Sequence, residues 1–563
     1  GSPLSPSSRT DLALARVTGN VATVFLAAVL CVFPLYIDHF SNLGLTKFTG
    51  GFTLLVAGCL ALLACAAIGA KAPAGRLSAR DGVLPALGVF VAANLLATVF
   101  SLSPVASAWG LGSYYGGLML VLLTAGGYLA MRAFAVLSDL PFVFFGVGVT
   151  ASIVAVLYLL NIFNIDLIGA YENTAVVERA QFFSTLGQKD FCGGFFAIAL
   201  PLVFYAYLQA RGAKQTLLYG VPMIFGALAM AIVDAEALTL GIVCAAMILV
   251  CHKDFTTREV RRGAWIGVAF FLWAGWMHWM RASVYTQGGK SILAHAGDWQ
   301  VALPGTAFCL AVFGWLQWRA VRGKPEIALY RLGRALTALT IGVTLAAVLL
   351  ANFWPGFPSL GALDNFLVFN KDWGTWRGTA WQAAFGAWWD APLWRKLVGY
   401  GPGMMHQAVE AWAGDAMTAR LATFYAAHNE FLEQLLTTGL LGLAGWVAFL
   451  TAALRRGFAA WGRPGAAPVL LALCSYLAQS VVSIRVSMLF PLVMLLFGVL
   501  AVSAAPEPPA IAAESGPKAR RRQQAKPAAP SNPLRRWGAL ALAAVATMAG
   551  CAPLSHLLPW FLF

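Results

Sequence analysis

Apolar runs of roughly 18 residues or more recur along the whole chain, and this feature constrains its possible folds most strongly. A helix needs about 20 apolar residues to cross the hydrocarbon core of a bilayer. Of the 563 residues, 60% are hydrophobic and only 11% are charged, which is more apolar surface than a soluble protein of this size can bury. The sequence therefore predicts an all-α polytopic membrane protein.

We predict about fifteen transmembrane helices, with the N-terminus in the cytoplasm. The predicted spans are 20–37, 50–70, 82–100, 116–136, 140–162, 191–209, 217–233, 236–251, 263–280, 301–320, 334–355, 431–454, 467–484, 487–505 and 537–555. With this alternation most Lys and Arg residues fall on the cytoplasmic side, as the positive-inside rule requires. The net charge of +15 therefore reflects membrane topology, and we expect no nucleic acid partner.

The composition divides the chain into three parts. Residues 1–505 hold the first fourteen spans and form the main transmembrane domain. Residues 506–536 are rich in Pro and Ala, contain the basic stretch KARRRQQAK, and are predicted to be a cytoplasmic linker. Residues 537–563 add one C-terminal transmembrane helix. The loops on the outer side that are long enough to carry function are 163–190, 281–300 and 356–430.

The longest outer loop, 356–430, contains a predicted helix. Its seven tryptophans between positions 373 and 412 make disorder unlikely on compositional grounds, so we expect ordered structure. Arg377, Trp381, Ala384 and Trp388 recur at helical spacing, and the turn residues GYGPG are predicted to end this helix. Two interpretations stay open: an amphipathic helix on the membrane surface, or a helix whose arginine faces an anion.

The earlier outer loop carries ERAQFFSTLGQKDFCGGFFAIALPL, residues 178–202. Arg179 and Lys189 bracket a short turn before a helix that we expect to begin near Phe191. Cations beside a helix N-terminus favour an anion site. The alternative is that these charges only position the chain at the membrane surface, and for Lys189 the two interpretations are about equally supported.

A third polar cluster lies in TFYAAHNEFLEQLLTTGLLGL, residues 423–443. His428 immediately precedes an apolar helix that Asn429 is expected to cap. A helix N-terminus disfavours imidazolium, so the ring stays neutral and can accept a proton. The alternative is a half-buried histidine whose hydrogen bonds are satisfied. No combination of His, Cys and Asp has the spacing of a metal site, so we expect no metal ion and no cofactor.

These three segments, in this order, resemble the O-antigen ligase and O-antigen polymerase superfamily of bacterial inner-membrane glycosyltransferases. AHNEFLEQLLTTGLLGL is similar to the family's His-Asn-x-x-Leu segment with its Gly-x-x-Gly ending, here Gly439 and Gly442. WRGTAWQAAFGAWWDAPLWRKLVGYGPG is similar to its Arg, Trp, Ala, Pro and Gly-x-Gly run in the large periplasmic loop. The segment at 178–202 is similar to its Arg followed by Thr-Leu-Gly-Asn-Pro-Asn. The resemblance covers roughly residues 178–455.

The chain also departs from the family pattern. Gln188-Lys189-Asp190 stands where Asn-Pro-Asn is usual, and Asp234-Ala235-Glu236 stands where Ser-Arg-Gly is frequent. An arginine that some members use is therefore missing here. About fifteen helices also exceed the roughly dozen of a minimal ligase.

The resemblance implies a chemistry. The donor is a glycan on undecaprenyl diphosphate at the periplasmic face of the bacterial inner membrane, and the acceptor is a sugar hydroxyl. His428 is the implied general base, and Arg179, Arg377 and Arg420 are implied to hold the diphosphate. Lys189, Asn429 and Glu430 complete the predicted substrate-binding set. The transfer would invert the anomeric centre without a metal ion.

The acceptor stays open within this family. A lipid-linked glycan (polymerase) is slightly favoured over lipid A–core (ligase) and over a protein side chain, because of the size and the extra helices. The alternative from another class is a lipid or solute transporter. Transporters usually place ionisable residues or broken helices at mid-membrane, and the predicted spans contain almost none.

Overall fold

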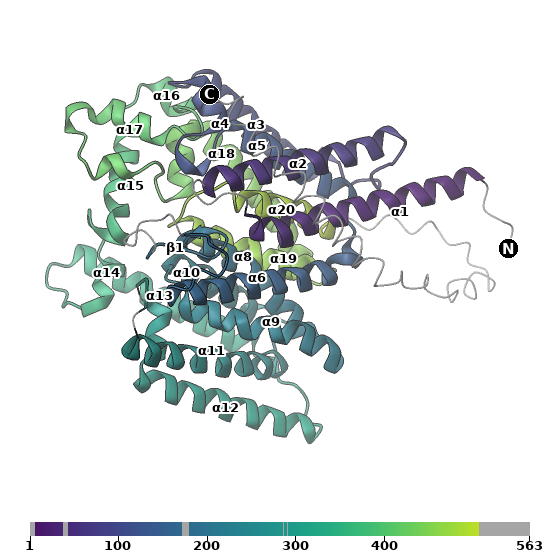
Figure 1. Ribbon diagram of the computed structural model, residues 1–563, viewed down its shortest axis with the longest axis vertical. Coiled ribbons are helices and arrows are strands. Elements are labelled where there is room, and N and C mark those ends of the chain that lie inside the picture. The colour runs from purple at the N-terminus through teal and green to yellow at the C-terminus, as the bar shows by residue number, and fades with distance from the viewer. Residues whose placement is uncertain (1–5, 38–42, 172–179, 285, 290, 506–563) are drawn as a thin grey trace.

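The computed structural model describes residues 6–37, 43–171, 180–284, 286–289 and 291–505. Over these residues the chain is all-α apart from one antiparallel hairpin of two-residue strands, β1 (Phe182–Phe183) and β2 (Gly187–Gln188) (Figure 1). The predicted fold class is therefore confirmed.

The helices that match predicted spans are α1 (Pro6–Ala27), α2 (Leu43–Ala67), α3 (Val83–Val99), α5 (Leu118–Phe134), α6 (Leu140–Ile162), α8 (Lys189–Gln209), α9 (Gly212–Ile232), α10 (Glu236–Cys251), α11 (Thr257–Ser283), α12 (Trp299–Val321), α13 (Tyr330–Phe353), α18 (Glu430–Ala459), α19 (Ala466–Ser480) and α20 (Phe490–Ser503). Every predicted span up to residue 505 overlaps one of them, although the first, 20–37, overlaps only the C-terminal part of α1. The last span, 537–555, and the linker 506–536 lie outside the described residues.

Length and composition of these helices support membrane insertion. Within the part of the chain that the structure describes, eight helices are long and apolar enough to cross a membrane, and five shorter apolar helices accompany them. α11 has 27 residues, but its apolar stretch is rich in tryptophan, which lowers its hydropathy. The chain is a polytopic membrane protein.

The helices are layered from a buried centre to an exposed edge. α20 is apolar on every side and nearly all of its residues are buried, as expected of a central helix. α5, α18 and α19 pack beside it, and α8 packs on α19. On one side of the bundle α9, α11 and α12 follow in succession (Figure 1). α12 and α13 bury almost none of their apolar surface within the protein, which suits helices that face lipid.

Four short helices gather at one end of the bundle (Figure 1): α14 (Asp364–Leu367), α15 (Trp373–Trp389), α16 (Leu393–Val398) and α17 (Met405–Ala413). They belong to the long outer loop, and α15, α16 and α17 pack on α18. Alanines on α15 allow a close approach, because Ala380, Ala384 and Ala387 are buried against α17 and the start of α18. A further short helix, α4 (Pro104–Trp109), precedes α5.

The GYGPG turn was predicted to end the helix of the long loop, and this prediction is wrong. α15 ends at Trp389, just before Asp390-Ala391-Pro392, and α16 intervenes before the turn. The glycines of the turn, Gly399, Gly401 and Gly403, all have positive φ. Only glycine adopts this backbone without strain, so the turn can fold tightly against α18.

α18 is broken at Gly439 (φ 64°, ψ −170°), contrary to the prediction of continuous spans. The break frees carbonyl groups of the preceding turn. Tyr400 N–H donates to the Leu436 carbonyl (3.2 Å), and Gly401 N–H donates to the Thr437 carbonyl (2.7 Å). The GYGPG turn therefore satisfies the backbone that the broken helix exposes, as non-helical backbone in a membrane requires.

Lys47 is a fully buried charge near the N-terminus of α2. α1 continues into irregular turns, and their carbonyls at Phe33 (3.2 Å) and Pro34 (2.9 Å) accept hydrogen bonds from Lys47 Nζ. The lysine therefore satisfies a helix end that has lost its regular ladder.

Candidate functional site

His428 lies in a turn that is fixed from both sides. Asn429 caps α18, because its side-chain oxygen accepts from the N–H groups of Phe431 (3.1 Å) and Leu432 (3.0 Å). The Glu433 carboxylate accepts from the Ala427 N–H at 2.7 Å. Between these clamps His428 has φ +52°, a left-handed conformation that is uncommon for residues other than glycine. Such conformations persist where the surroundings hold them, which is frequent at functional sites.

Arg377 is the first residue of the regular part of α15. The three residues before it, Gly374, Thr375 and Trp376, have positive φ and turn the chain sharply. The guanidinium is only 18% exposed, yet it is poorly satisfied. Its hydrogen bonds to the Gly374 carbonyl (3.3 Å) and to Asp190 Oδ2 (3.4 Å) are long, and its buried Nε has no partner among the described residues. A buried donor without an acceptor is costly, so this guanidinium can gain an acceptor from a ligand.

Asp190 comes from the first turn of α8, which the β1–β2 hairpin positions. The tertiary structure thus brings Asp190, Arg377 and His428 together from three separate segments. Burial and the nearby charge of Arg377 lower the pKa of His428 to about 4, while Asp190 acts in the opposite direction. The imidazole is therefore neutral at pH 7 and can accept a proton.

A small polar cavity lies behind His428. Its volume is about 30 Å³, which is room for about one water molecule. Tyr114, Glu433 and Arg485 contribute polar groups to its wall. Burial and the charges of Asp190 and Glu433 raise the pKa of Tyr114 to about 12, so its hydroxyl stays protonated.

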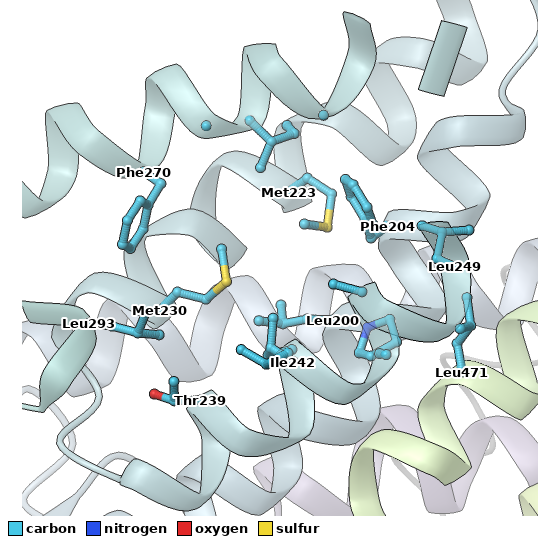
Figure 2. Close-up of a pocket in the computed structure, with 17 residues that line it drawn as sticks. Leu200, Phe204, Met223, Met230, Thr239, Ile242, Leu249, Phe270, Leu293 and Leu471 are labelled. Carbon is cyan, nitrogen blue, oxygen red and sulfur yellow. The ribbon is translucent and has the colours of Figure 1, made fainter. Parts of the chain in front are cut away.

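A larger cavity, of about 300 Å³, lies between α8, α9, α10 and α11. Figure 2 shows that apolar side chains such as Met223, Phe270 and Leu249 surround it, with Thr239 as the polar exception among the labelled residues. It holds no titratable group and cannot carry acid–base chemistry. The cluster of Asp190, Arg377 and His428, by contrast, combines a carboxylate, a guanidinium and an imidazole.

The other predicted site residues lie in different environments. Glu430 is fully buried and forms an ion pair with Arg485 Nη2 at 2.7 Å. Lys189 pairs with Asp234 at 2.9 Å, and Arg420 pairs with Asp372 at 3.1 Å. Arg179 lies outside the described residues.

Arg420 still supports the site indirectly. Its guanidinium stacks on Trp376 at 4.2 Å from the ring centre, and Trp376 belongs to the left-handed turn before Arg377. Arg420 is nearly half exposed, and the contacts described for it hold this turn. Asn429 acts as the cap that the sequence predicts.

His406 contacts the segment before His428. Its Nδ1 lies 3.0 Å from the Phe424 carbonyl oxygen, and its ring stacks on Tyr425 at 4.5 Å. His406 therefore supports the segment that leads to His428.

Sequence reasoning missed Asp190, which contacts Arg377, and it missed Glu433, Arg485 and Tyr114, which line the small cavity beside His428. Asp190 appeared only as a departure from a motif. Glu433 had a usable signal, since an acid four residues after a capping Asn can reach back to the preceding turn. Nothing in the sequence connects Arg485, 55 residues away, with Glu430.

The fold and this cluster define the class: an all-α polytopic membrane protein with a histidine, an arginine and a carboxylate at the end of the bundle that carries the long loop. In the described part of the chain, no group of three or more His, Cys, Asp or Glu side chains could hold a metal ion. No protein-family model matches the sequence, and no curated protein matches it either.

Proposed function

We propose that this protein is a glycosyltransferase that moves a glycan from undecaprenyl diphosphate to a sugar hydroxyl at the periplasmic face of the bacterial inner membrane. The observation that carries the proposal is the under-satisfied guanidinium of Arg377 next to a neutral, strained His428. An arginine with a buried free donor suits a diphosphate, and a neutral imidazole suits a general base.

The chemistry follows from these two groups. His428 takes the proton of the acceptor hydroxyl as the oxygen attacks the anomeric carbon. The bond from that carbon to the diphosphate oxygen breaks, and the diphosphate leaves with the electron pair. Arg377 stabilises the charge on the leaving group. Attack from the side opposite the leaving group inverts the anomeric centre.

Donor binding would also strengthen the base. The charge of Arg377 lowers the pKa of His428. A diphosphate bound to Arg377 brings negative charge that offsets the guanidinium, and this raises the pKa of His428 towards neutrality. A general base works best when its pKa lies near the operating pH. His428 is thus a weak base in the unliganded protein and becomes a stronger base when the donor is bound.

One observation supports the alternative that the protein is a transporter, namely the break in α18 at Gly439. In transporters the carbonyls of such breaks coordinate ions. Here the Leu436 and Thr437 carbonyls already accept hydrogen bonds from Tyr400 and Gly401. The break therefore serves to seat the GYGPG turn, and the transferase proposal is favoured.

The decisive experiment is incubation of the purified protein with a defined lipid-linked oligosaccharide, followed by gel analysis. A ladder of longer lipid-linked products identifies a polymerase, which we favour slightly because of the size of the protein. Transfer to added lipid A–core identifies a ligase, and labelled protein identifies an oligosaccharyltransferase. Absence of any transferred glycan, in protein that remains folded, contradicts the proposal.

A further inference from the structure

Asp190 contacts the candidate site, although no role for it followed from the sequence. Its carboxylate is 14% exposed and lies 3.4 Å from Arg377 Nη2. A tight charge-assisted hydrogen bond measures about 2.7–2.9 Å, so this pair is loose. Despite the nearby carboxylate, one buried donor of Arg377 has no partner among the residues that the structure describes. Asp190 is therefore a weak ligand of Arg377, which a diphosphate with several oxygens can displace.

The charged and titratable groups around Asp190 and His428 come from several packed elements. They are Arg377 from α15, Tyr114 from the turn before α5, Tyr158 from α6, Cys192 within α8, and Glu433 and Arg485 from the cavity wall. The negative charge of Asp190 raises the pKa of His428 and so favours the protonated imidazolium form.

We propose that Asp190 is a further positioning residue of this site. It holds the Arg377 guanidinium in the unliganded protein, and once a diphosphate takes over Arg377 it stabilises the protonated form of His428. The proton that His428 takes comes from the acceptor hydroxyl, and Asp190 itself neither gains nor loses one. This inference rests on the proposed function and names the residue that couples donor binding to the base.

The competing explanation is structural, because an acid in the first turn of a helix stabilises it through the helix dipole. Glu236 offers a matched control. It lies in the first turn of α10, also at an outer helix start, where it accepts from the Ile292 N–H at 2.9 Å. A purely structural role would give Asp190→Asn and Glu236→Gln the same consequences.

The first experiment measures binding of inorganic diphosphate to the full chain in detergent by calorimetry, and it needs no transferase activity. Asp190→Asn is expected to bind diphosphate as tightly as the wild type or several-fold more tightly, because a competitor for Arg377 is gone. Arg377→Gln is expected to lose this binding. Weaker binding in Asp190→Asn than in the wild type would overturn the proposal.

The second experiment measures transfer rates against pH. Asp190→Asn is expected to lower kcat by about 10²-fold, the lower end of the range for impaired base catalysis, without raising the donor KM. Its acidic limb should move to lower pH, because removal of the carboxylate lowers the pKa of His428 further. Asp190→Glu should recover part of the rate, and Glu236→Gln should leave the profile in place. An unchanged profile in Asp190→Asn contradicts the proposal and leaves the proposed function standing.

If the wild type transfers no glycan, the proposed function fails instead. The proposal about Asp190 is then tested by the diphosphate-binding experiment alone. Retained or tighter binding in Asp190→Asn together with loss in Arg377→Gln supports the competition between carboxylate and anion, and any other pattern overturns it.

Discussion

Two arginine–carboxylate pairs lie near the start of α18, and they differ in how well they are satisfied. Arg485 donates to Glu430 at 2.7 and 3.1 Å, Tyr476 donates to the same carboxylate, and the arginine is packed among the rings of Phe90, Trp446 and Phe490. Arg377 and Asp190 are 3.4 Å apart and partly exposed, and within the described part of the chain the Arg377 Nε has no acceptor.

The two pairs differ in how well their hydrogen bonds are satisfied, and we interpret the well-satisfied pair as structural and the loose pair as part of the candidate site. His428 and Glu430 are two residues apart, but Asn429 begins α18 between them. Glu430 is the first residue of the helix and is directed into the buried pair. His428 is held outside the helix, next to the loose pair. A saturated, buried ion pair resists exchange of partners, whereas a loose one can exchange its carboxylate for a ligand.

The strongest test of this comparison removes the histidine. His428→Ala is expected to reduce the transfer rate by about 10²–10⁴-fold, because a general base is lost while the Asn429 cap stays. The rate is measured with a lipid-linked oligosaccharide donor. His295→Ala is the control, because His295 is 61% exposed and pairs only with Asp298 in the described contacts. His406 is unsuitable, since it supports the segment before His428. A normal rate in well-folded His428→Ala protein would end its assignment as base.

Loss of one partner of the buried Arg485–Glu430 pair is predicted to lower the stability of the protein. Glu430→Ala leaves the Arg485 charge buried without its carboxylate, which costs about 3–5 kcal/mol. Thermal unfolding in detergent should show a large fall in Tm, and the double variant Glu430→Leu/Arg485→Met should recover much of it. Asp190→Asn, at the loose pair, should lower Tm by less than Glu430→Ala does, because Asp190 makes a single long hydrogen bond of 3.4 Å to Arg377. Equal decreases in Tm for Glu430→Ala and Asp190→Asn would contradict the proposed difference between the two pairs.

A smaller effect on activity is expected from Arg377→Lys. Lysine keeps the charge but loses the planar fork, including the Nε that has no partner. Loss of one hydrogen bond to a charged group corresponds to about 10–100-fold in kcat/KM. Arg420→Lys should lose less, because Arg420 contacts Trp376 and Asp372. Full activity in Arg377→Lys would favour a purely positional role at the membrane surface.

The smallest expected effect is that of metal removal. In the proposed mechanism the positive charge of Arg377 neutralises the diphosphate, so transfer should proceed at the same rate in EDTA. The assay uses purified protein in liposomes, where residual metal can be controlled. Loss of activity in EDTA that magnesium or manganese restores would contradict the arginine-based mechanism.

Membrane insertion and helix order could be predicted from the sequence because each depends on local composition. A run of about 20 apolar residues is favourable in a bilayer whatever its neighbours are. The cap at Asn429 is local in the same way, since the side chain bonds the next two N–H groups that need an acceptor. The roles proposed for His428 and Arg377 came from short motifs, and they remain predictions.

The tertiary structure alone decided which polar groups meet. Asp190 reaches Arg377 across 187 positions, and Arg485 reaches Glu430 across 55. The break at Gly439 depends on the GYGPG turn, about 40 residues earlier, to supply its hydrogen bonds. A charge or a freed carbonyl inside a membrane needs a partner, but its sequence position does not specify which distant group provides one. That choice depends on the packing of the helices, which brings the starts of α8, α15 and α18 to one end of the bundle.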